Sequence, residues 1–411
     1  MNISLAIYNF ILFFAIVIFY PVLSFYLKTN ISKKYPIWVH CASLGEVKIA
    51  LRLVNALMNK LNLKNSDILI TTTTISAKNF AINFHKEVAI LPLDFYFFVK
   101  KITTKVQPRV FILIETEIWP NYINVIKKFG SKIFILNGRV SKKTFIFLKM
   151  FNFMFKNLLN KVDLILVREK IDYIRFKNIG IAEEKIKITG NMKYDDLDSF
   201  EINVKKEDFS FNSEDFVITF GSIREGEEKE IIKFIKKFKE ENNLKFILAP
   251  RHLNLVKKIC KILNKQKISY KLRTNSDRLN FKCLVVNTHG ELKKFYKISD
   301  LVFVCGSILP YGGQNFLEAA SLGKTVVLGP YVFNFLEPAK LFLSNQAVIQ
   351  VSNLVEFYSV VKDALNFPQK YLKIGLRAKE LIQKLKGVTE KNIQLIEPYL
   401  ISSLYEKNFN N

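Results

Sequence analysis

Short apolar runs alternate with longer helical patterns along most of this chain, and this alternation restricts the fold more than any other feature. The first series of runs covers residues 37–39, 68–70, 110–114, 133–136 and 164–167. Runs that are rich in β-branched residues and apolar throughout are typical of parallel strands whose two faces are both covered by helices. The pattern therefore predicts an α/β domain with a doubly wound sheet.

A second series of apolar runs covers residues 216–220, 246–248, 284–286, 301–304 and 325–328. The segment between the two series, residues 195–215, is polar and charged and is typical of a linker. A chain of 411 residues is long enough for two domains of ordinary size. We expect Rossmann-like domains over residues 28–205 and 206–385, facing a central cleft, and a C-terminal helical segment over residues 386–411.

Residues 3–27 carry no charged side chain, and Lys28, Lys33 and Lys34 follow them. A helix of about 20 apolar residues is long enough to span the hydrocarbon core of a bilayer. We therefore predict a transmembrane anchor helix within residues 1–27, with a cleaved signal peptide or an interfacial segment as the alternatives. Because lysines follow the apolar run, the rest of the chain is expected on the cytoplasmic side.

The formal net charge is +26 at pH 7. An AT-rich genome, which favours Lys, Asn, Ile, Phe and Tyr codons together, explains this charge as well as attraction to anionic phosphate does. The four cysteines have no CxxC spacing, and the four histidines are not spaced as metal ligands. This argues against a zinc site and a disulfide framework, and we expect neither a metal nor another cofactor.

Motifs with polar residues follow the predicted strands of the first half. The segments are 40–46, 115–121, 137–141 and 190–195, and their candidate site residues are Glu46, Glu115, Glu117, Arg139 and Lys193. Gly45 would permit a tight turn before a helix that begins near Glu46. A carboxylate at that helix start can accept a proton from a hydroxyl, although it also complements the helix dipole. Glu115 and Glu117 alternate at a strand end, so we expect one of them to face the site.

The second half contains a glycine-rich loop between a predicted strand and a helix start. The candidate residues of this loop and of the helix start are Gly306, Ser307, Gly312, Gly313, Asn315 and Glu318. Those at two other strand ends are Gly221, Ser222 and Arg251. Glycines let a backbone approach a ligand closely, and a helix N-terminus attracts phosphate. A carboxylate three residues after an amide can reach a ribose hydroxyl, so this loop indicates a nucleotide-sugar site.

Taken together, these motifs resemble those of the bacterial 3-deoxy-D-manno-octulosonic acid (Kdo) transferases, glycosyltransferase family 30. The resemblance extends from the N-terminal apolar segment to about residue 340. It implies a GT-B fold, an inner-membrane location with the catalytic domains on the cytoplasmic side, and inverting, metal-independent transfer of Kdo from CMP-Kdo to a lipid A precursor in lipopolysaccharide synthesis. It also implies that Glu46 is the catalytic base, that Glu115, Glu117 and Arg139 lie on the acceptor side, and that Lys193 and the residues of the second half bind the donor.

The sequence departs from the family pattern at several positions. Gln314 stands where the family usually has histidine, and an amide cannot carry a proton at neutral pH. Leu253 and Asn254 replace a usual Pro-Glu pair. The acidic run 195–198 has a D-x-D-like appearance, but a helix cap or a linker is the simpler interpretation.

Two other functions remain open from the sequence alone. One is a GT-B transferase that uses a UDP-sugar, which differs in the nucleotide it binds. The other is a basic, membrane-tethered nucleic-acid-binding protein, which would need clusters of aromatic and basic residues on an exposed sheet. The sequence shows no such module, so we expect CMP-Kdo, a lipid A precursor and an anionic membrane surface as partners, and no nucleic acid.

Overall fold

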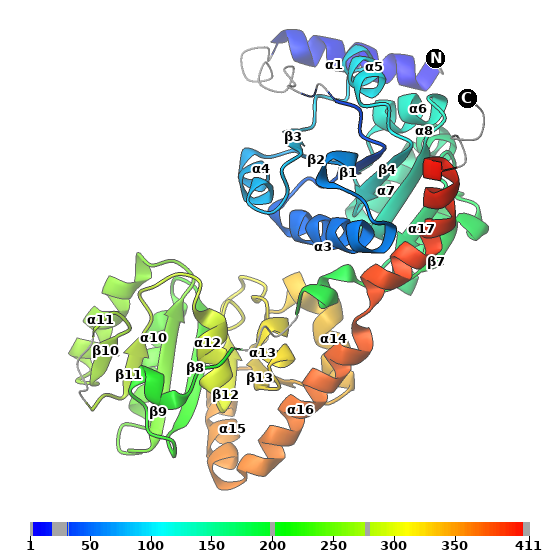
Figure 1. Cartoon of the computed structure of the whole chain (residues 1–411). Helices are drawn as coiled ribbons and strands as arrows, with labels where there is room; N and C mark the ends of the chain where they lie inside the picture. Colours follow the sequence, from blue (N-terminus) through cyan, green and yellow to red (C-terminus); the bar gives the residue numbers. More distant parts are fainter. Residues whose placement is uncertain (1–2, 19–30, 32, 198–201, 276–279, 406–411) are drawn as a thin grey trace. The chain divides into compact units, whose positions relative to one another are not determined.

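The structure is a computed structural model, and it describes residues 3–18, 31, 33–197, 202–275 and 280–405. The chain divides into two compact units (Figure 1). The first comprises Met1–Asp196 together with Leu385–Asn411, and the second comprises Leu197–Lys384. Each unit is built around a parallel sheet, as the strand pattern predicted.

The described part of the first domain contains a seven-stranded sheet in the order β3-β2-β1-β4-β5-β6-β7. All its strand pairs are parallel. The strands are β1 (Ile37–His40), β2 (Ile68–Thr72), β3 (Val88–Ile90), β4 (Val110–Ile114), β5 (Lys132–Gly138), β6 (Leu164–Val167) and β7 (Ile186–Ile188). The central strands are buried throughout, which explains why their sequences are apolar without alternation.

Helices cover both faces of this sheet, and each face has its own apolar cluster. One face packs against α5 (Tyr96–Val106), α6 (Pro120–Lys128), α7 (Lys142–Met150), α8 (Asn152–Leu159) and α9 (Lys170–Ile179). The other packs against α3 (Leu44–Leu61), α4 (Ile75–Ile82) and α17 (Val388–Tyr405).

The second domain repeats this plan, with the strand order β10-β11-β9-β8-β12-β13-β14 in its described residues. Its strands are β8 (Phe216–Ile223), β9 (Leu244–Pro250), β10 (Tyr270–Leu272), β11 (Cys283–Val285), β12 (Leu301–Val304), β13 (Thr325–Leu328) and β14 (Ile349–Gln350). Its helices are α10 (Glu227–Lys236), α11 (Leu255–Lys265), α12 (Leu292–Ile298), α13 (Leu317–Ser321), α14 (Leu336–Ser344), α15 (Leu354–Asn366) and α16 (Pro368–Leu385).

Helix α17 gives the last part of the chain a specific place, because it packs into the first domain rather than standing apart. The Asp195 carboxylate caps the first turn of α17. One carboxylate oxygen accepts hydrogen bonds from the backbone N–H groups of Gly387 and Val388, and the other accepts from the N–H and the hydroxyl of Thr389. The acidic run at 195 therefore caps a helix that lies almost 200 residues further along the chain.

The described part of the predicted anchor is helix α1 (Ile3–Ile18), which lies against the first domain near α5 (Figure 1). Asn9 is buried and exchanges side-chain hydrogen bonds with Asn121, and the Tyr8 hydroxyl donates to Asp94 at 3.0 Å. Residues 19–27 of the predicted anchor lie outside the described residues. In the part of the chain that the structure describes, no helix is long and apolar enough to cross a membrane, so the predicted anchor has no support here.

Candidate functional site

The candidate residues of the first domain gather at the carboxyl edge of its sheet. Because parallel strands all end at the same edge, loops that follow different strands meet there. Glu46 lies in the first turn of α3 after β1, Glu115 follows β4, and Arg139 follows β5. Lys193 lies in a 3₁₀ turn after β7, which runs from Met192 to Leu197.

Glu46 is a buried carboxylate held by two hydrogen bonds. Its side chain is only 7% exposed, the Ser43 hydroxyl donates to one oxygen at 2.7 Å, and the Ala42 N–H donates to the other at 2.7 Å. Burial raises the pKa of Glu46, the two hydrogen bonds lower it, and the charge of Glu115 raises it further, with a net rise. A carboxylate with a raised pKa is a better proton acceptor than an exposed one.

Gly45 does not have the role that the sequence suggested. It lies within α3 and does not have a positive φ. A Cβ at this position would meet only the Ser43 hydroxyl oxygen, at 4.0 Å. The glycine is therefore not required for a turn, and it leaves the surface beside Glu46 open.

Glu115 and Glu117 do not alternate as strand residues. Strand β4 ends at Ile114, and Glu115 has a left-handed backbone with φ of 59°. Burial raises the pKa of Glu117 to about 7, and the charges of Glu46 and Glu115 contribute. Both carboxylates are electrostatically coupled to Glu46, and the expectation that one of them faces the site stays a prediction.

Positive side chains lie next to these carboxylates. Lys193 donates to Glu115 at 2.7 Å, so this lysine belongs to the acidic group of the first domain. Arg139 is exposed, and its backbone N–H donates to the Thr116 hydroxyl oxygen.

Sequence analysis missed Arg168, which directly follows β6. Its side chain is 12% exposed, and its Nε lies 3.9 Å from an oxygen of Asp172. The charges of Arg139 and Glu115 both reach its guanidinium. Its position after a strand was the signal that could have found it.

In the second domain, the Glu227 side chain binds the backbone of the glycine-rich loop. This carboxylate is fully buried, and it accepts hydrogen bonds from the N–H groups of Gly306 at 2.8 Å, Ile308 at 3.0 Å and Arg224 at 2.9 Å. The Ser307 hydroxyl accepts from the N–H of Gly329 at 2.9 Å and donates to the Val304 carbonyl. The N–H groups of Gly306 and Ile308 thus bind a carboxylate of the protein itself.

Two other candidate glycines of the second domain, Gly221 and Gly312, lie against bulky side chains. A Cβ on Gly221 would lie 2.2 Å from the hydroxyl oxygen of the buried Tyr296. A Cβ on Gly312 would lie 2.4 Å from the ring of Phe333. Ser222 is buried with φ of 61° and turns the end of β8.

A basic and polar group lies where β8 and β9 end. The Arg224 guanidinium stacks on the Tyr311 ring at 4.8 Å and lies 3.4 Å from the His252 Nε2 atom. Arg251 is exposed, and its N–H donates to the carbonyl of Ile223, so strand pairing fixes the backbone beside this group. Arg224 directly follows β8, and no pattern in the sequence singled it out.

Asn315 and Glu318 contact each other through their side chains. The Asn315 amide donates to a carboxylate oxygen of Glu318 at 3.1 Å, and its oxygen accepts from the N–H of Leu317 at the start of α13. Both residues retain exposed surface. In the described residues no group of three or more His, Cys, Asp or Glu side chains is arranged to hold a metal ion.

Comparison with known proteins gives this arrangement a context. The profile of the family described as 3-deoxy-D-manno-octulosonic-acid transferase (kdotransferase) matches residues 21–196. A 3-deoxy-D-manno-octulosonic acid transferase from Haemophilus influenzae is 28% identical over 373 residues, which is 89% of this chain and 87% of that protein. The chain is therefore similar to the Kdo transferases, through the family match over residues 21–196 and through relatives that align with most of its length. A bifunctional glycosyltransferase/methyltransferase from Fusobacterium nucleatum is 30% identical over 87% of this chain, but the match spans only 59% of that longer protein.

Solved structures with little sequence identity share the fold of this chain. A UDP-N-acetylglucosamine 2-epimerase from Listeria monocytogenes, described as putative, has a TM-score of 0.60 at 12% identity, covering 91% of this chain and 97% of the other. Anabaena HepE in complex with UDP has a TM-score of 0.56 at 16% identity, covering 90% and 100%. These likenesses agree with the GT-B class of two parallel α/β domains.

Proposed function

We propose that the protein transfers Kdo from CMP-Kdo to a lipid A precursor in lipopolysaccharide synthesis. The observation that carries the proposal is Glu46, a buried carboxylate with a raised pKa at the carboxyl edge of the first sheet, within the residues that match the Kdo transferase family. Neighbouring carboxyl groups at Glu115 and Glu117 support a site that accepts protons.

The proposed step is a single displacement. An acceptor hydroxyl oxygen forms a bond to the anomeric carbon of Kdo while the bond from that carbon to the phosphate oxygen of CMP breaks. The hydroxyl proton passes to Glu46, and the electron pair of the broken bond leaves with CMP. One displacement inverts the configuration at the anomeric carbon.

Charge develops on the phosphate of CMP as it leaves, and positive side chains can stabilise it without a metal ion. Arg251 and Arg224 at the ends of β8 and β9 are the proposed contacts. Asn315 and Glu318 are the proposed contacts to the ribose hydroxyls, since their side chains are paired and exposed. Gly306 then acts by holding the loop on Glu227, and Ser307 acts by holding it against Val304 and Gly329.

The acceptor side has positive charge suited to a phosphorylated disaccharide. Arg139, Arg168 and Lys193 lie beside the carboxylates of the first domain. We propose that they bind a phosphate of the lipid A precursor. Lys193 is therefore reassigned from the donor to the acceptor.

The test uses purified protein, CMP-Kdo and lipid IVA, with CMP release and the mass of the lipid as readouts. Glu46→Gln should lower the turnover by about 100- to 10,000-fold, the usual contribution of a general base. Glu184→Gln, at an exposed glutamate of the same domain, is the matched control and should keep full activity. Unchanged turnover in Glu46→Gln would remove Glu46 from the mechanism, and tighter binding of UDP than of CMP would favour the UDP-sugar alternative.

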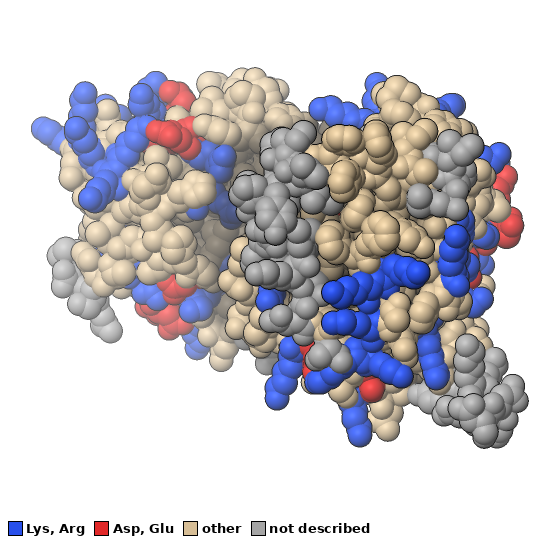
Figure 2. All heavy atoms as spheres, turned by 90° about the horizontal axis from the view of Figure 1, so that it is seen from above, with Lys and Arg blue, Asp and Glu red and all other residues tan. Residues whose placement is uncertain are grey.

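We also propose that the first domain attaches to the anionic face of the inner membrane through α1, lying in the plane of the interface. Ile7, Phe10, Phe13 and Phe14 are exposed on this helix, while Asn9 faces the domain. Figure 2, seen from the side on which α1 lies in Figure 1, shows Lys and Arg side chains gathered beside uncharged surface. Such surfaces bind anionic bilayers through apolar and electrostatic contacts together.

Vesicle flotation tests the attachment. The wild-type protein should float with vesicles containing anionic lipid, and Phe10→Asp combined with Phe13→Asp should reduce the bound fraction severalfold. Phe367→Asp, at an exposed phenylalanine of the second domain, is the control and should bind like the wild type. Equal flotation of all variants would show that α1 does not make the contact.

A further inference from the structure

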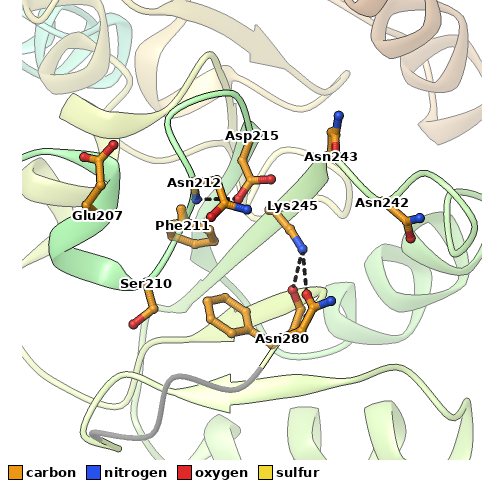
Figure 3. A pocket seen from close by; sticks show the side chains of 10 residues that line it. Glu207, Ser210, Phe211, Asn212, Asp215, Asn242, Asn243, Lys245 and Asn280 are labelled. Carbon is orange, nitrogen blue, oxygen red and sulfur yellow. Dashed lines mark hydrogen bonds between the residues drawn. The ribbon is translucent and has the colours of Figure 1, made fainter.

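A polar pocket in the second domain lies away from the candidate donor residues. It has a volume of about 470 Å³ and is lined by Glu207, Ser210, Phe211, Asn212, Asp215, Asn242, Asn243, Lys245, Asn280 and Phe281 (Figure 3). Strands β8 and β9 begin at Phe216 and Leu244, so the pocket lies at the amino edge of the sheet. Arg251 and the glycine-rich loop follow the carboxyl ends of the strands, at the opposite edge.

Lys245 points into this region from β9 and is 91% buried as a residue, its exposure being 9%. Its Nζ donates to the side-chain oxygen of Asn280 at 3.1 Å and to the carbonyl of Phe281 at 3.1 Å (Figure 3). Both acceptors are uncharged. A buried ammonium group without a carboxylate partner is costly, and a bound anion would offset that cost.

Two further buried lysines lie around Phe281. Lys271 donates to the Ser210 hydroxyl oxygen at 3.0 Å, and its Nζ lies 5.9 Å from the centre of the Phe281 ring. Lys282 donates to the backbone carbonyl of Glu241, and burial together with the charge of Lys245 lowers the pKa of Lys282 to about 8. The hydrogen-bond acceptors of all three amines are thus neutral oxygens.

Acidic groups also lie near these lysines, and the charges of Glu241 and Asp215 both act on Lys282. The Glu241 carboxylate pairs with Lys362 at 2.7 Å, and an Asp215 oxygen accepts from the N–H of Asn212 at 2.7 Å. Glu207 is exposed and lies apart from Lys245 in Figure 3. These carboxylates therefore leave the positive charge around Phe281 only partly compensated.

The remaining lining residues suit a ligand with hydroxyl groups. Four asparagine side chains border the pocket, and each amide can donate and accept. The buried rings of Phe211 and Phe281 add an apolar wall. The volume lies in the range of small-molecule sites.

We propose that this pocket binds a phosphorylated monosaccharide, with its phosphate beside Lys245 and its hydroxyl groups on the asparagines. This second site is separate from that for the nucleotide sugar and does not depend on the proposed transferase activity.

Isothermal titration of the full chain with glucose 6-phosphate, inorganic phosphate and glucose tests the proposal. Glucose 6-phosphate should bind more tightly than phosphate, and glucose should bind most weakly. Lys245→Gln should weaken glucose 6-phosphate binding by about 10- to 100-fold, as expected for loss of hydrogen bonds to a charged group. Lys373→Gln, an exposed lysine of the same domain, should bind as the wild type does.

Arg251→Gln separates this pocket from the opposite edge of the sheet. Binding that survives in Arg251→Gln and is lost in Lys245→Gln supports the proposal, and the reverse pattern overturns it. If Lys245→Gln does not fold, Lys271→Gln replaces it, and hydrogen exchange of the wild type should show ligand protection at residues 242–245 and 280–285. No binding to the wild type, or protection elsewhere only, also overturns the proposal.

Discussion

The hydrogen bond from Ser43 to Glu46 offers a sharp test of the proposed base. The Ser43 hydroxyl is not used to cap α3 and donates instead to the carboxylate at 2.7 Å. This bond stabilises the ionised form of Glu46, so Ser43→Ala should raise the pKa of Glu46 above its wild-type value. A hydrogen bond to a charged group is worth about 1.5–3 kcal/mol, which corresponds to about 10- to 100-fold in the ratio of ionised to protonated carboxyl.

The sign of the effect follows from the role of a base. Only the ionised carboxylate accepts a proton, so raising the pKa of Glu46 reduces activity on the acidic side of the pH profile. On the alkaline side Glu46 is ionised in both proteins, and the rates should converge. The assay is kcat/KM for CMP release against pH, where Ser43→Ala should be about 10- to 100-fold slower at acidic pH and close to wild type at alkaline pH.

Ser141→Ala is the matched control. The Ser141 hydroxyl caps α7 in the same domain by accepting from the N–H of Thr144 at 3.0 Å, and no carboxylate is involved. This variant should lose about 1 kcal/mol of stability without moving the pH profile. An equal loss of activity for Ser43→Ala at every pH would refute the reasoning, because Ser43 would then act on the substrate rather than on the ionisation of Glu46.

Three further predictions concern folding stability. Asp195→Ala should lower the free energy of unfolding by about 3 kcal/mol in urea titrations, because buried donors at the start of α17 lose their acceptor; a loss below 1 kcal/mol would contradict the capping role. Gly221→Ala should cost about 1–3 kcal/mol, since its Cβ would meet Tyr296, and an unchanged melting temperature would disprove the clash. Burial raises the pKa of Asp94 from 3.8 to about 7, so between these values the folded protein holds a proton that the unfolded chain releases. The stability of the wild type should therefore decrease as the pH rises from about 4 to 7. Asp94→Asn should show a flatter dependence, and identical slopes would argue against this titration.

The sequence predicted the central strands of both sheets but not the outer ones. Strands β3, β7, β10 and β14 lie at the four sheet edges and contain only two or three residues each. An edge strand pairs on one side only, and each of these segments has at most one buried residue. Their sequences therefore carry little of the apolar signal that marked the interior strands.

The site was predictable where it depends on strand ends and not where it depends on side-chain pairing. Loops after parallel strands must share an edge, so the strand pattern alone places the loops that carry Glu46 and Glu115 at the same edge of the sheet. The partner of Glu115 could not be foreseen, because Lys193 lies 78 residues away in sequence. The hydrogen bonds from the glycine-rich loop to Glu227 likewise join residues that are 79 and 81 positions apart in the sequence. Local pattern carries no information on such distant pairs.

The discontinuity of the first domain has a consequence for synthesis on the ribosome. The apolar face of α3 is completed by Val388, Ile396 and Leu400 of α17, which emerge only after the whole second domain has been translated. The second domain can therefore fold during translation. Until α17 has been synthesised, the first domain exposes an apolar surface to which chaperones can bind. A premature stop just before Val388 should leave a structured second domain attached to an aggregation-prone first one.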